Sequence, residues 1–145
     1  MSSPPAASAG YSVAPLPKKL GIKDTSTVTI VGGPMPVLPV GPTGGRAPYD
    51  VVLAFVTMAA DLRASIAEWS SLITPDGGLW ICWPKKTARK LVPAFSECDM
   101  TEDVVREVVL PMGLVDNKVC AVDEVWSGLR VVWRVEHRAA RRSAV

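Results

Sequence analysis

The pattern of apolar positions predicts three buried strands and one long helix in the first part of the chain. β-Branched residues dominate 27–31 ("TVTIV"), which turn-forming residues bound, and a second buried strand is predicted over 50–56. Residues 79–83 ("LWICW") are apolar at every position, which is typical of a strand covered on both faces. Between these strands a helix is predicted over 58–73, because apolar residues recur there at steps of three and four: Met58, Leu62, Ile66, Trp69 and Leu72. The turn formers "TPDGG" are expected to end this helix.

The second part of the chain predicts a shorter helix and a hairpin. The helix is expected over 101–110, with Thr101 as its N-cap and acidic residues in its first turn, where the helix dipole favours them. Two β-rich runs follow, at 117–125 and 129–136, and Ser127-Gly128 between them is a short-turn signal. An antiparallel hairpin is therefore predicted at the C-terminal side of the fold.

This order of elements predicts the α/β class, with a small Rossmann-like sheet of mostly parallel strands that ends in the antiparallel hairpin. We expect one domain over residues 15–137. Residues 1–14 form a Pro/Ala/Ser-rich stretch that is predicted to be a disordered tail, and residues 138–145 a basic C-terminal tail. The segment 32–49 is rich in glycine and proline, so it is predicted to be a long loop without a regular helix.

Composition and charge narrow the class of protein. The 145 residues are 48% apolar, typical of a globular domain, yet no apolar run approaches the roughly 20 residues that span a bilayer. The first residues lack the basic and apolar regions of a secretory signal, and the three cysteines are widely spaced, so a cytoplasmic protein with reduced thiols is expected. A net charge of +2 does not by itself favour nucleic acid, and one histidine gives poor support for a metal site.

The candidate binding residues lie where the strand 79–83 ends. Pro84 cannot continue a strand ladder because it has no N–H, so Lys85 and Lys86 are expected to emerge at the carboxyl edge of the sheet. Open α/β sheets bind their ligands beyond this edge. We therefore predict that Lys85 and Lys86 belong to the rim of a site that accepts an anion or a carboxylate partner.

A second group of polar residues is a candidate to join this rim. Asp123 and Glu124 interrupt the first arm of the predicted hairpin, and Arg130 lies in the second arm. One interpretation is a functional cluster with Lys85, and the other is a cross-strand ion pair that involves Arg130. His137 is expected to be a solvated residue at the end of the last strand, and Cys82 a small apolar core residue.

Several motifs carry a resemblance to a known family. "KKLGIKD", "YDVVLAF", "LITPDGGLWICWPKK", "TEDVVREV" and above all "GLVDNKVCAVDEVWSGLRVVWR" resemble a bacterial family known only as a domain of unknown function, from about Tyr11 to Arg134. That family has no established activity, so the resemblance implies a fold and no chemistry. More distantly, "YDVV", "ITPDGG" and the terminal hairpin are similar to the second half of class I S-adenosylmethionine-dependent methyltransferases.

The chain departs from the methyltransferase pattern at the cofactor loop. A methyl-donor site of that kind needs a glycine loop that leads into a helix, and an acidic residue on the next strand. Here Gly32 and Gly33 are followed by Pro34 and Pro36, which exclude a helix, and no suitable acidic residue precedes Tyr49. The sequence therefore predicts turn glycines and no cofactor at Gly32-Gly33.

Three functional hypotheses follow. The first is a cytoplasmic α/β binding or interaction module that has a methyltransferase-like fold without the cofactor loop, and whose partner is another protein or a small anionic ligand. The second is an enzyme, either a minimal S-adenosylmethionine-dependent methyltransferase or another group-transfer catalyst that acts beside Lys85 and Lys86. The third is an anion- or RNA-binding accessory protein that uses the basic run 85–90, although this run lacks the aromatic residues that stack on RNA bases.

Overall fold

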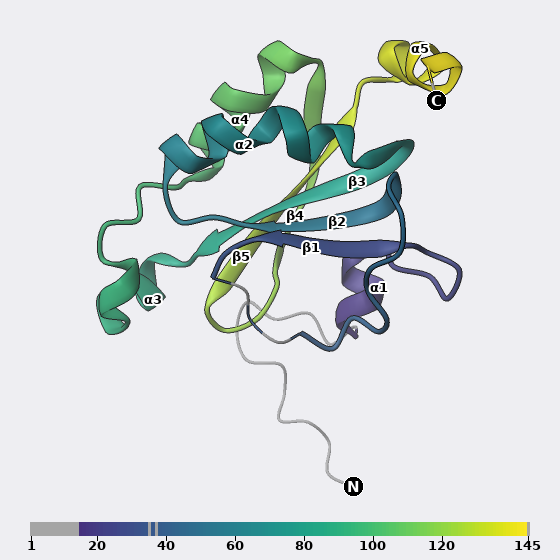
Figure 1. Cartoon of the computed structure of the whole chain (residues 1–145). Coiled ribbons are helices and arrows are strands. Elements are labelled where there is room, and N and C mark those ends of the chain that lie inside the picture. The colour runs from purple at the N-terminus through teal and green to yellow at the C-terminus, as the bar shows by residue number, and fades with distance from the viewer. Residues whose placement is uncertain (1–14, 35, 37, 145) are drawn as a thin grey trace, which may run out of the picture.

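The computed structural model describes residues 15–34, 36 and 38–144, so the predicted tail at 1–14 lies outside the described residues. A five-stranded sheet with the order β1-β2-β3-β5-β4 forms the centre of the fold (Figure 1). β1, β2 and β3 are parallel, and β5 pairs antiparallel with both β3 and β4. The strands are β1 (Val28–Gly32), β2 (Tyr49–Phe55), β3 (Ile73–Pro84), β4 (Leu114–Ala121) and β5 (Trp126–Trp133). The predicted α/β class and the mixed, mostly parallel sheet are confirmed.

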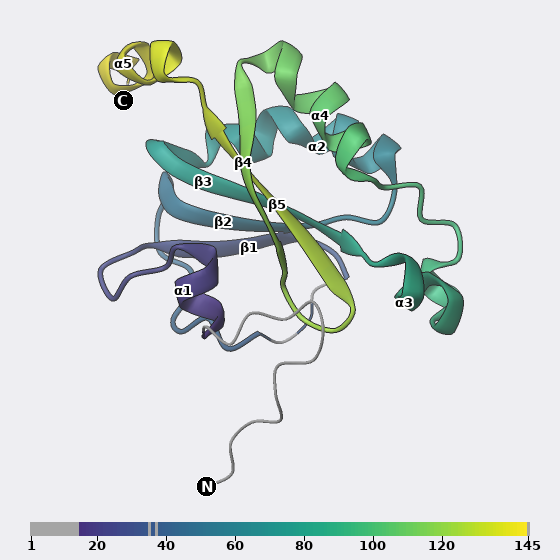
Figure 2. The same cartoon turned by 180° about the vertical axis from the view of Figure 1, so that it is seen from behind.

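Helices lie on both faces of this sheet (Figures 1 and 2). In these views α2 (Ala59–Ser71) and α4 (Glu102–Val109) lie above the sheet, and α1 (Leu16–Leu20) lies below it. Beyond the carboxyl end of β3 comes α3 (Lys86–Leu91), and after the last strand comes α5 (Val135–Ala144). There are also two single 3-10 turns: Pro93–Phe95 lies between α3 and α4, and Leu110–Met112 directly follows α4.

The face below α2 and α4 holds the larger core. On α2 Leu62, Ile66 and Trp69 are buried, as the helical spacing predicted, whereas Met58 and Leu72 lie just outside the helix and are half-buried. α4 buries Val105 and Val109. From β5, alternate residues Leu129, Val131 and Trp133 join the same cluster. This alternation is the two-residue period of a strand, so the neighbours of these residues face the other side of the sheet.

The α1 face holds a second apolar cluster around Trp80, which is fully buried. The indole Nε1 of Trp80 donates to the carbonyl of Leu20 at 3.0 Å, which ties α1 to the middle of the sheet. α1 ends at Gly21, whose left-handed conformation (φ +77°) stops the helix. Because α1 has only five residues, it leaves side chains of β4 and β5 on this face partly open to solvent.

The long loop after β1 has no helix or strand in its described residues, as its composition predicted. It still contributes to packing, because Val40 is buried in the α1-face cluster. The N–H of Gly44 donates to the carbonyl of Val28 at 2.8 Å, so the loop also covers part of the outer edge of β1.

The strand β3 is longer than the sequence predicted. α2 ends at Ser71, and β3 begins at Ile73 rather than at residue 79, so "TPDGG" belongs to the strand. The glycines allow this extension, since a Cβ on Gly77 would lie 2.9 Å from the carbonyl oxygen of Asp50 on β2. Gly77 therefore lets the backbones of β2 and β3 approach closely, where the sequence pattern indicated only a turn.

The hairpin was predicted in the wrong register. Its turn lies at 122–125, and Ser127 and Gly128 lie within β5. Asp123 stabilises this turn, because its Oδ1 accepts from the N–H groups of Val125 and Trp126 at 2.8 and 2.7 Å. Gly128 is required for packing instead, since a Cβ there would lie 3.1 Å from the ring of Trp80.

Two further predictions near the C-terminus need correction. β5 ends at Trp133, so the strand predicted to reach residue 136 stops earlier. The residues predicted as a basic tail form most of α5, which the side chain of Arg142 joins to Asp76 through an ion pair of 2.9 Å. Arg141 lies 3.2 Å from the ring centroid of Trp133, a cation–π contact that the sequence did not reveal.

Candidate functional site

A hollow of about 490 Å³ lies at the carboxyl end of β3, and we call it the carboxyl-edge cleft. β3, α3, the start of α4 and β5 all contribute to its wall. Residues that line it include Trp83, Lys85, Lys86, Thr101, Glu102 and Ser127. Its volume lies within the roughly 300–1,000 Å³ of small-molecule sites.

Lys85 and Lys86 line this cleft. β3 ends at Pro84, as predicted, and the two lysines follow at the carboxyl edge. The N–H of Lys85 donates to the carbonyl of Val125 at 2.8 Å, which fixes the backbone against the hairpin turn. Lys85 is half-buried and precedes the first residue of α3, whereas Lys86 is exposed. The helix α3 itself was missed, because its six residues are too few for a recognisable apolar period.

Arg89 has a structural role on the α3 side of the cleft. Its Nε donates to the carbonyl of Pro84 at 3.1 Å, and its Nη2 donates to the carbonyl of Met100. Arg89 thus joins the end of β3, α3 and the approach to α4. The wall that carries Lys85 and Lys86 is held in place by these bonds.

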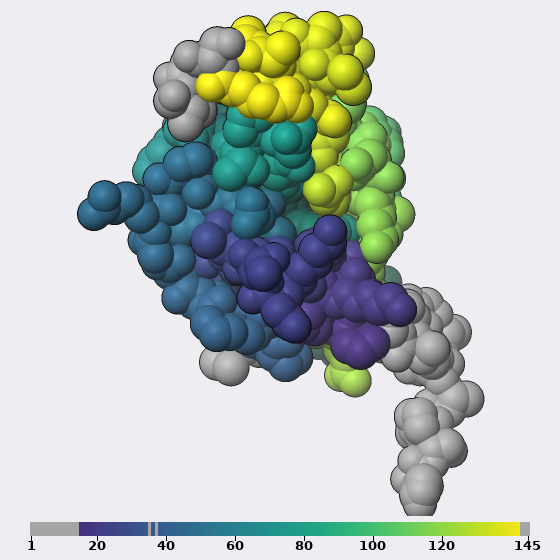
Figure 3. Space-filling model, turned by 90° about the vertical axis from the view of Figure 1, so that its right-hand side faces the viewer, coloured from purple at the N-terminus to yellow at the C-terminus, as the bar shows by residue number. Residues whose placement is uncertain are grey.

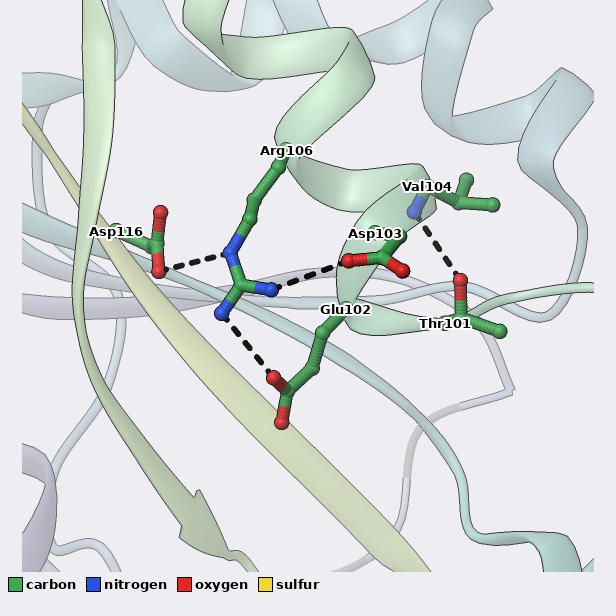
Figure 4. A network of polar contacts seen from close by, with 6 residues as sticks. All are labelled: Thr101, Glu102, Asp103, Val104, Arg106 and Asp116. Carbon is green, nitrogen blue, oxygen red and sulfur yellow. Dashed lines mark hydrogen bonds and ion pairs between the residues drawn. The ribbon is translucent and has the colours of Figure 1, made fainter.

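Arg106 contacts Glu102 and Asp103, which line the cleft from α4, in a polar network (Figure 4). Its guanidinium contacts Glu102 at 3.1 Å, Asp103 at 3.3 Å and Asp116 at 3.1 Å. The hydrogen bond to Asp116 is the main cause that raises the pKa of Arg106 above its ordinary value. Glu102 and Asp103 lie within one turn of Arg106 on α4, but Asp116 lies on β4, so sequence spacing could not reveal the complete network.

The N-cap of α4 at Thr101 is confirmed. Its Oγ1 accepts from the N–H of Val104 at 3.1 Å (Figure 4). Thr101→Ala is therefore expected to lower the free energy of unfolding by about 0.5–2 kcal/mol. Thr101→Ser, which keeps the acceptor, should change it much less, and urea titration of both variants measures the difference. Equal losses in the two variants would show that the cap hydrogen bond contributes nothing.

Asp123 and Glu124 lie in the hairpin turn at 122–125. The same turn contains Val125, whose carbonyl accepts from the N–H of Lys85. Asp123 is engaged in that turn through its Oδ1, whereas Glu124 is exposed. Among the described residues, neither carboxylate forms an ion pair with Arg130, so the predicted cross-strand pair is not formed. The part of the two carboxylates in ligand binding stays a prediction.

The structure does not bring Arg130 to Lys85. Arg130 is paired in register with Trp80 and Lys118, while the end of β3 is paired with Trp126. Four residues of strand separate these levels, or roughly 13 Å. Arg130 and Lys85 therefore lie at different levels of the sheet, because the hairpin register places Arg130 in the middle of β5.

Gly32 and Gly33 make a close turn against β2. Gly32 has a φ of +78°, and a Cβ there would lie 2.2 Å from the carbonyl oxygen of Phe55. The N–H of Gly33 donates to the same oxygen at 3.0 Å. The described residues between Gly32 and α2 contain no helix, so they do not fit a glycine loop that leads into a helix N-terminus.

The other candidate residues lie away from the cleft. His137 belongs to α5 rather than to the end of a strand, and its ring lies beside Gly113. Cys82 is fully buried, and burial raises the pKa of its thiol, in keeping with a core residue. Among the described residues no cluster of potential metal ligands occurs. In the same part of the chain, no helix has the length and apolar character to cross a membrane.

Comparisons with known proteins give distant structural likenesses. No protein-family model and no curated protein sequence matches the chain, so the resemblance to a family of unknown function stays a prediction. The chain is similar to a ribosomal protein L11 methylase from Lactobacillus delbrueckii subsp. bulgaricus, with 14% identity, a TM-score of 0.37, and coverage of 59% of this chain and 37% of that one. It is similar to a fibrillarin pre-rRNA processing protein of Methanococcus jannaschii, with 12% identity, a TM-score of 0.40, and coverage of 60% and 37%.

A protein from Pyrococcus horikoshii OT3 gives a third likeness, with 11% identity, a TM-score of 0.40, and coverage of 64% of this chain and 58% of that one. The chain thus spans 37% to 58% of the length of the structures it resembles. Identities and TM-scores this low carry no argument about activity. The Rossmann-like α/β class rests on the sheet order and on the direction of its strands.

Proposed function

We propose that this chain is an α/β binding module that holds a small ligand in the carboxyl-edge cleft. The observation that carries the proposal is the position of Lys85 and Lys86, which line the cleft where the parallel strands end. Ligands of open α/β sheets bind beyond the carboxyl ends of the strands. The two ammonium groups favour a ligand with an anionic group, such as a phosphate or a carboxylate.

Binding is favoured over catalysis by what the other polar groups of the cleft already do. Thr101 caps α4, Arg89 bonds two backbone carbonyls, and Glu102 and Asp103 contact Arg106. Each of these side chains has a partner that the fold needs. Lys85 and Lys86 line the cleft from the end of β3 and the start of α3, so they are the cationic groups that we assign to the ligand.

The proposal is tested by a thermal-shift screen with nucleotides, S-adenosylmethionine and small carboxylates. The wild-type chain is compared with the double variant Lys85→Ser, Lys86→Ser. Exposed charges seldom contribute more than about 0.5 kcal/mol to stability, so the double variant should melt close to the wild type without ligand. A ligand at 100 times its Kd stabilises the wild type by about 2.7 kcal/mol, and this gain should be lost in the double variant.

The matched control is Lys23→Ser, Lys90→Ser, which removes the same charge from two exposed lysines that do not line the cleft. This control should respond to ligand as the wild type does. A double variant at 85 and 86 that unfolds would show that these lysines are structural. One that folds and keeps the ligand response would place the site elsewhere. A response to S-adenosylmethionine with methyl transfer would favour the enzyme hypothesis instead.

A further inference from the structure

A second cavity, of about 270 Å³, lies on the α1 face of the sheet, and we call it the α1-face cavity. It shares no lining residue with the carboxyl-edge cleft. The residues that line it include Lys19, Gly21, Trp80, Asn117, Lys118 and Arg130. Three of these are cationic, and no described residue of the lining is acidic. In the side view of Figure 3 the α1 segment (purple) lies next to the light green of β4. The hydrogen bonds between Lys19 and β4 confirm this contact.

Arg130 lines this cavity and has no hydrogen-bond acceptor among the residues that the structure describes. Its guanidinium lies over Gly78 of β3, since a Cβ on that glycine would lie 2.4 Å from Nε. The side chain is half-buried, yet it has no hydrogen bond or ion pair with any residue that the structure describes. Burial lowers the pKa of Arg130 first, and the positive charge of Arg138 lowers it further. A partly desolvated cation of this kind favours an anion beside it.

A β-bulge places Asp116 and Arg130 on opposite faces of the sheet. The register of β4 against β5 shifts between Asp116 and Lys118, so Asp116 pairs with Val131 and Lys118 pairs with Arg130. Without the bulge, residues two apart would share one face of the sheet. With it, Asp116 faces α4 and bonds Arg106, while Lys118 joins Arg130 on the α1 face. The bulge thus places the negative charge of Asp116 on the α4 face and the positive charge of Lys118 on the α1 face.

The two lysines are held in position by neutral acceptors. Nζ of Lys118 donates to the carbonyl of Lys19 at 2.8 Å, and Nζ of Lys19 donates to the carbonyl of Ala121 at 2.7 Å. These bonds fix the two lysines at the cavity wall. Each ammonium has three N–H donors, so the bond to one carbonyl does not exhaust the donors of Lys118.

From this arrangement we propose that the α1-face cavity binds an oxyanion of the phosphate type, with Arg130 as the main donor and Lys118 beside it. A planar guanidinium presents paired N–H groups that match two phosphate oxygens. The cavity has room for one phosphate group and a small organic body. It offers no exposed ring on which a base could stack, because Trp80, the aromatic residue that lines it, is fully buried. This site is separate from the one under the proposed function.

Calorimetric titration with inorganic phosphate and with glycerol 3-phosphate, at fixed ionic strength in chloride, tests the proposal. Saturable binding of at least one of them is expected. Phosphate alone would identify the free ion as the ligand, and equal or tighter binding of glycerol 3-phosphate would identify a small phosphorylated molecule. Arg130→Gln should weaken the binding at least about tenfold, because a charge-assisted bidentate contact is lost.

The matched control is Arg134→Gln, which removes the same charge from an exposed residue outside the cavity. It should bind phosphate as the wild type does, and so should Lys85→Ser, Lys86→Ser. If Arg130→Gln does not fold, Arg130→Lys keeps the charge without the planar donor pair and should bind several-fold more weakly. No saturable binding of either compound, or equal binding by wild type and the Arg130 variants, would overturn the proposal.

Discussion

Trp80→Ala is expected to lower the free energy of unfolding by about 3–5 kcal/mol, the usual loss for emptying a buried aromatic site. Trp80 is fully buried in the α1-face cluster, and its Nε1 donates to the carbonyl of Leu20. The substitution removes both the packing and the hydrogen bond that attaches α1 to the sheet. Chemical denaturation followed by circular dichroism measures the change.

Trp80→Phe separates these two contributions. Phenylalanine keeps much of the apolar volume but has no donor for Leu20, so its loss should be clearly smaller than that of the alanine variant. A loss below about 1 kcal/mol for Trp80→Ala would contradict the account, because a core position does not tolerate such a change. It would show that neither the packing of Trp80 nor its hydrogen bond to Leu20 contributes much to stability.

The second large effect is expected for Gly32→Ala at the end of β1. A Cβ at this position would lie 2.2 Å from the carbonyl oxygen of Phe55, which is backbone and cannot rotate away. The φ of +78° adds a conformational cost of about 1–2 kcal/mol for an L-residue. The overlap forces β1 away from β2 in addition, so the total loss in unfolding free energy should exceed the conformational cost alone.

Two other glycines provide matched controls for this prediction. Gly21 has nearly the same φ, +77°, but open space around its Cβ position, so Gly21→Ala reports the conformational cost without the overlap. Gly33 also has open space, and Gly33→Ala should be close to neutral. Melting temperatures should therefore fall in the order Gly33→Ala, Gly21→Ala, Gly32→Ala. Equal melting temperatures for the last two would contradict the close approach of β1 and β2.

Local patterns in the sequence predicted the fold where one element decides its own structure. The run 79–83 is apolar on both sides because β3 lies in the centre of the sheet, between β2 and β5. The spacing along α2 and the cap at Thr101 are likewise properties of single helices. Pro84 ended β3 as expected, since its missing N–H acts within the strand. For these elements the sequence contained the physical cause.

Features that depend on two elements could not be predicted in this way. Gly128 looked like a turn glycine, but its reason is the ring of Trp80 on the neighbouring strand. Gly77 and Gly78 looked like a turn as well, although they admit the backbone of β2 and the guanidinium of Arg130. In each case the glycine is required by a partner distant in sequence. Hairpin register, and with it the position of Arg130, therefore followed from contacts that no local pattern records.

The same distinction applies to the candidate site, where the positions set by β3 were predicted and the contacts between elements were not. Lys85 and Lys86 were expected at the carboxyl edge from Pro84 alone, and they line the cleft there. The wall formed by α4 and Arg106 was not expected, because Asp116 reaches Arg106 from another element. The α1-face cavity was also missed, since Lys19 and Lys118 meet only when α1 lies against β4.

The most direct test of the ligand site is a nuclear magnetic resonance titration of the labelled chain with the compounds of the thermal-shift screen. The account predicts that the ligand changes the amide resonances of the carboxyl-edge cleft: Trp83, Lys85, Lys86, Thr101 and Ser127. These changes should saturate in the wild type and be lost in Lys85→Ser, Lys86→Ser. Ligand-dependent changes confined to residues outside the cleft, or no saturable change with any compound of the screen, would contradict it.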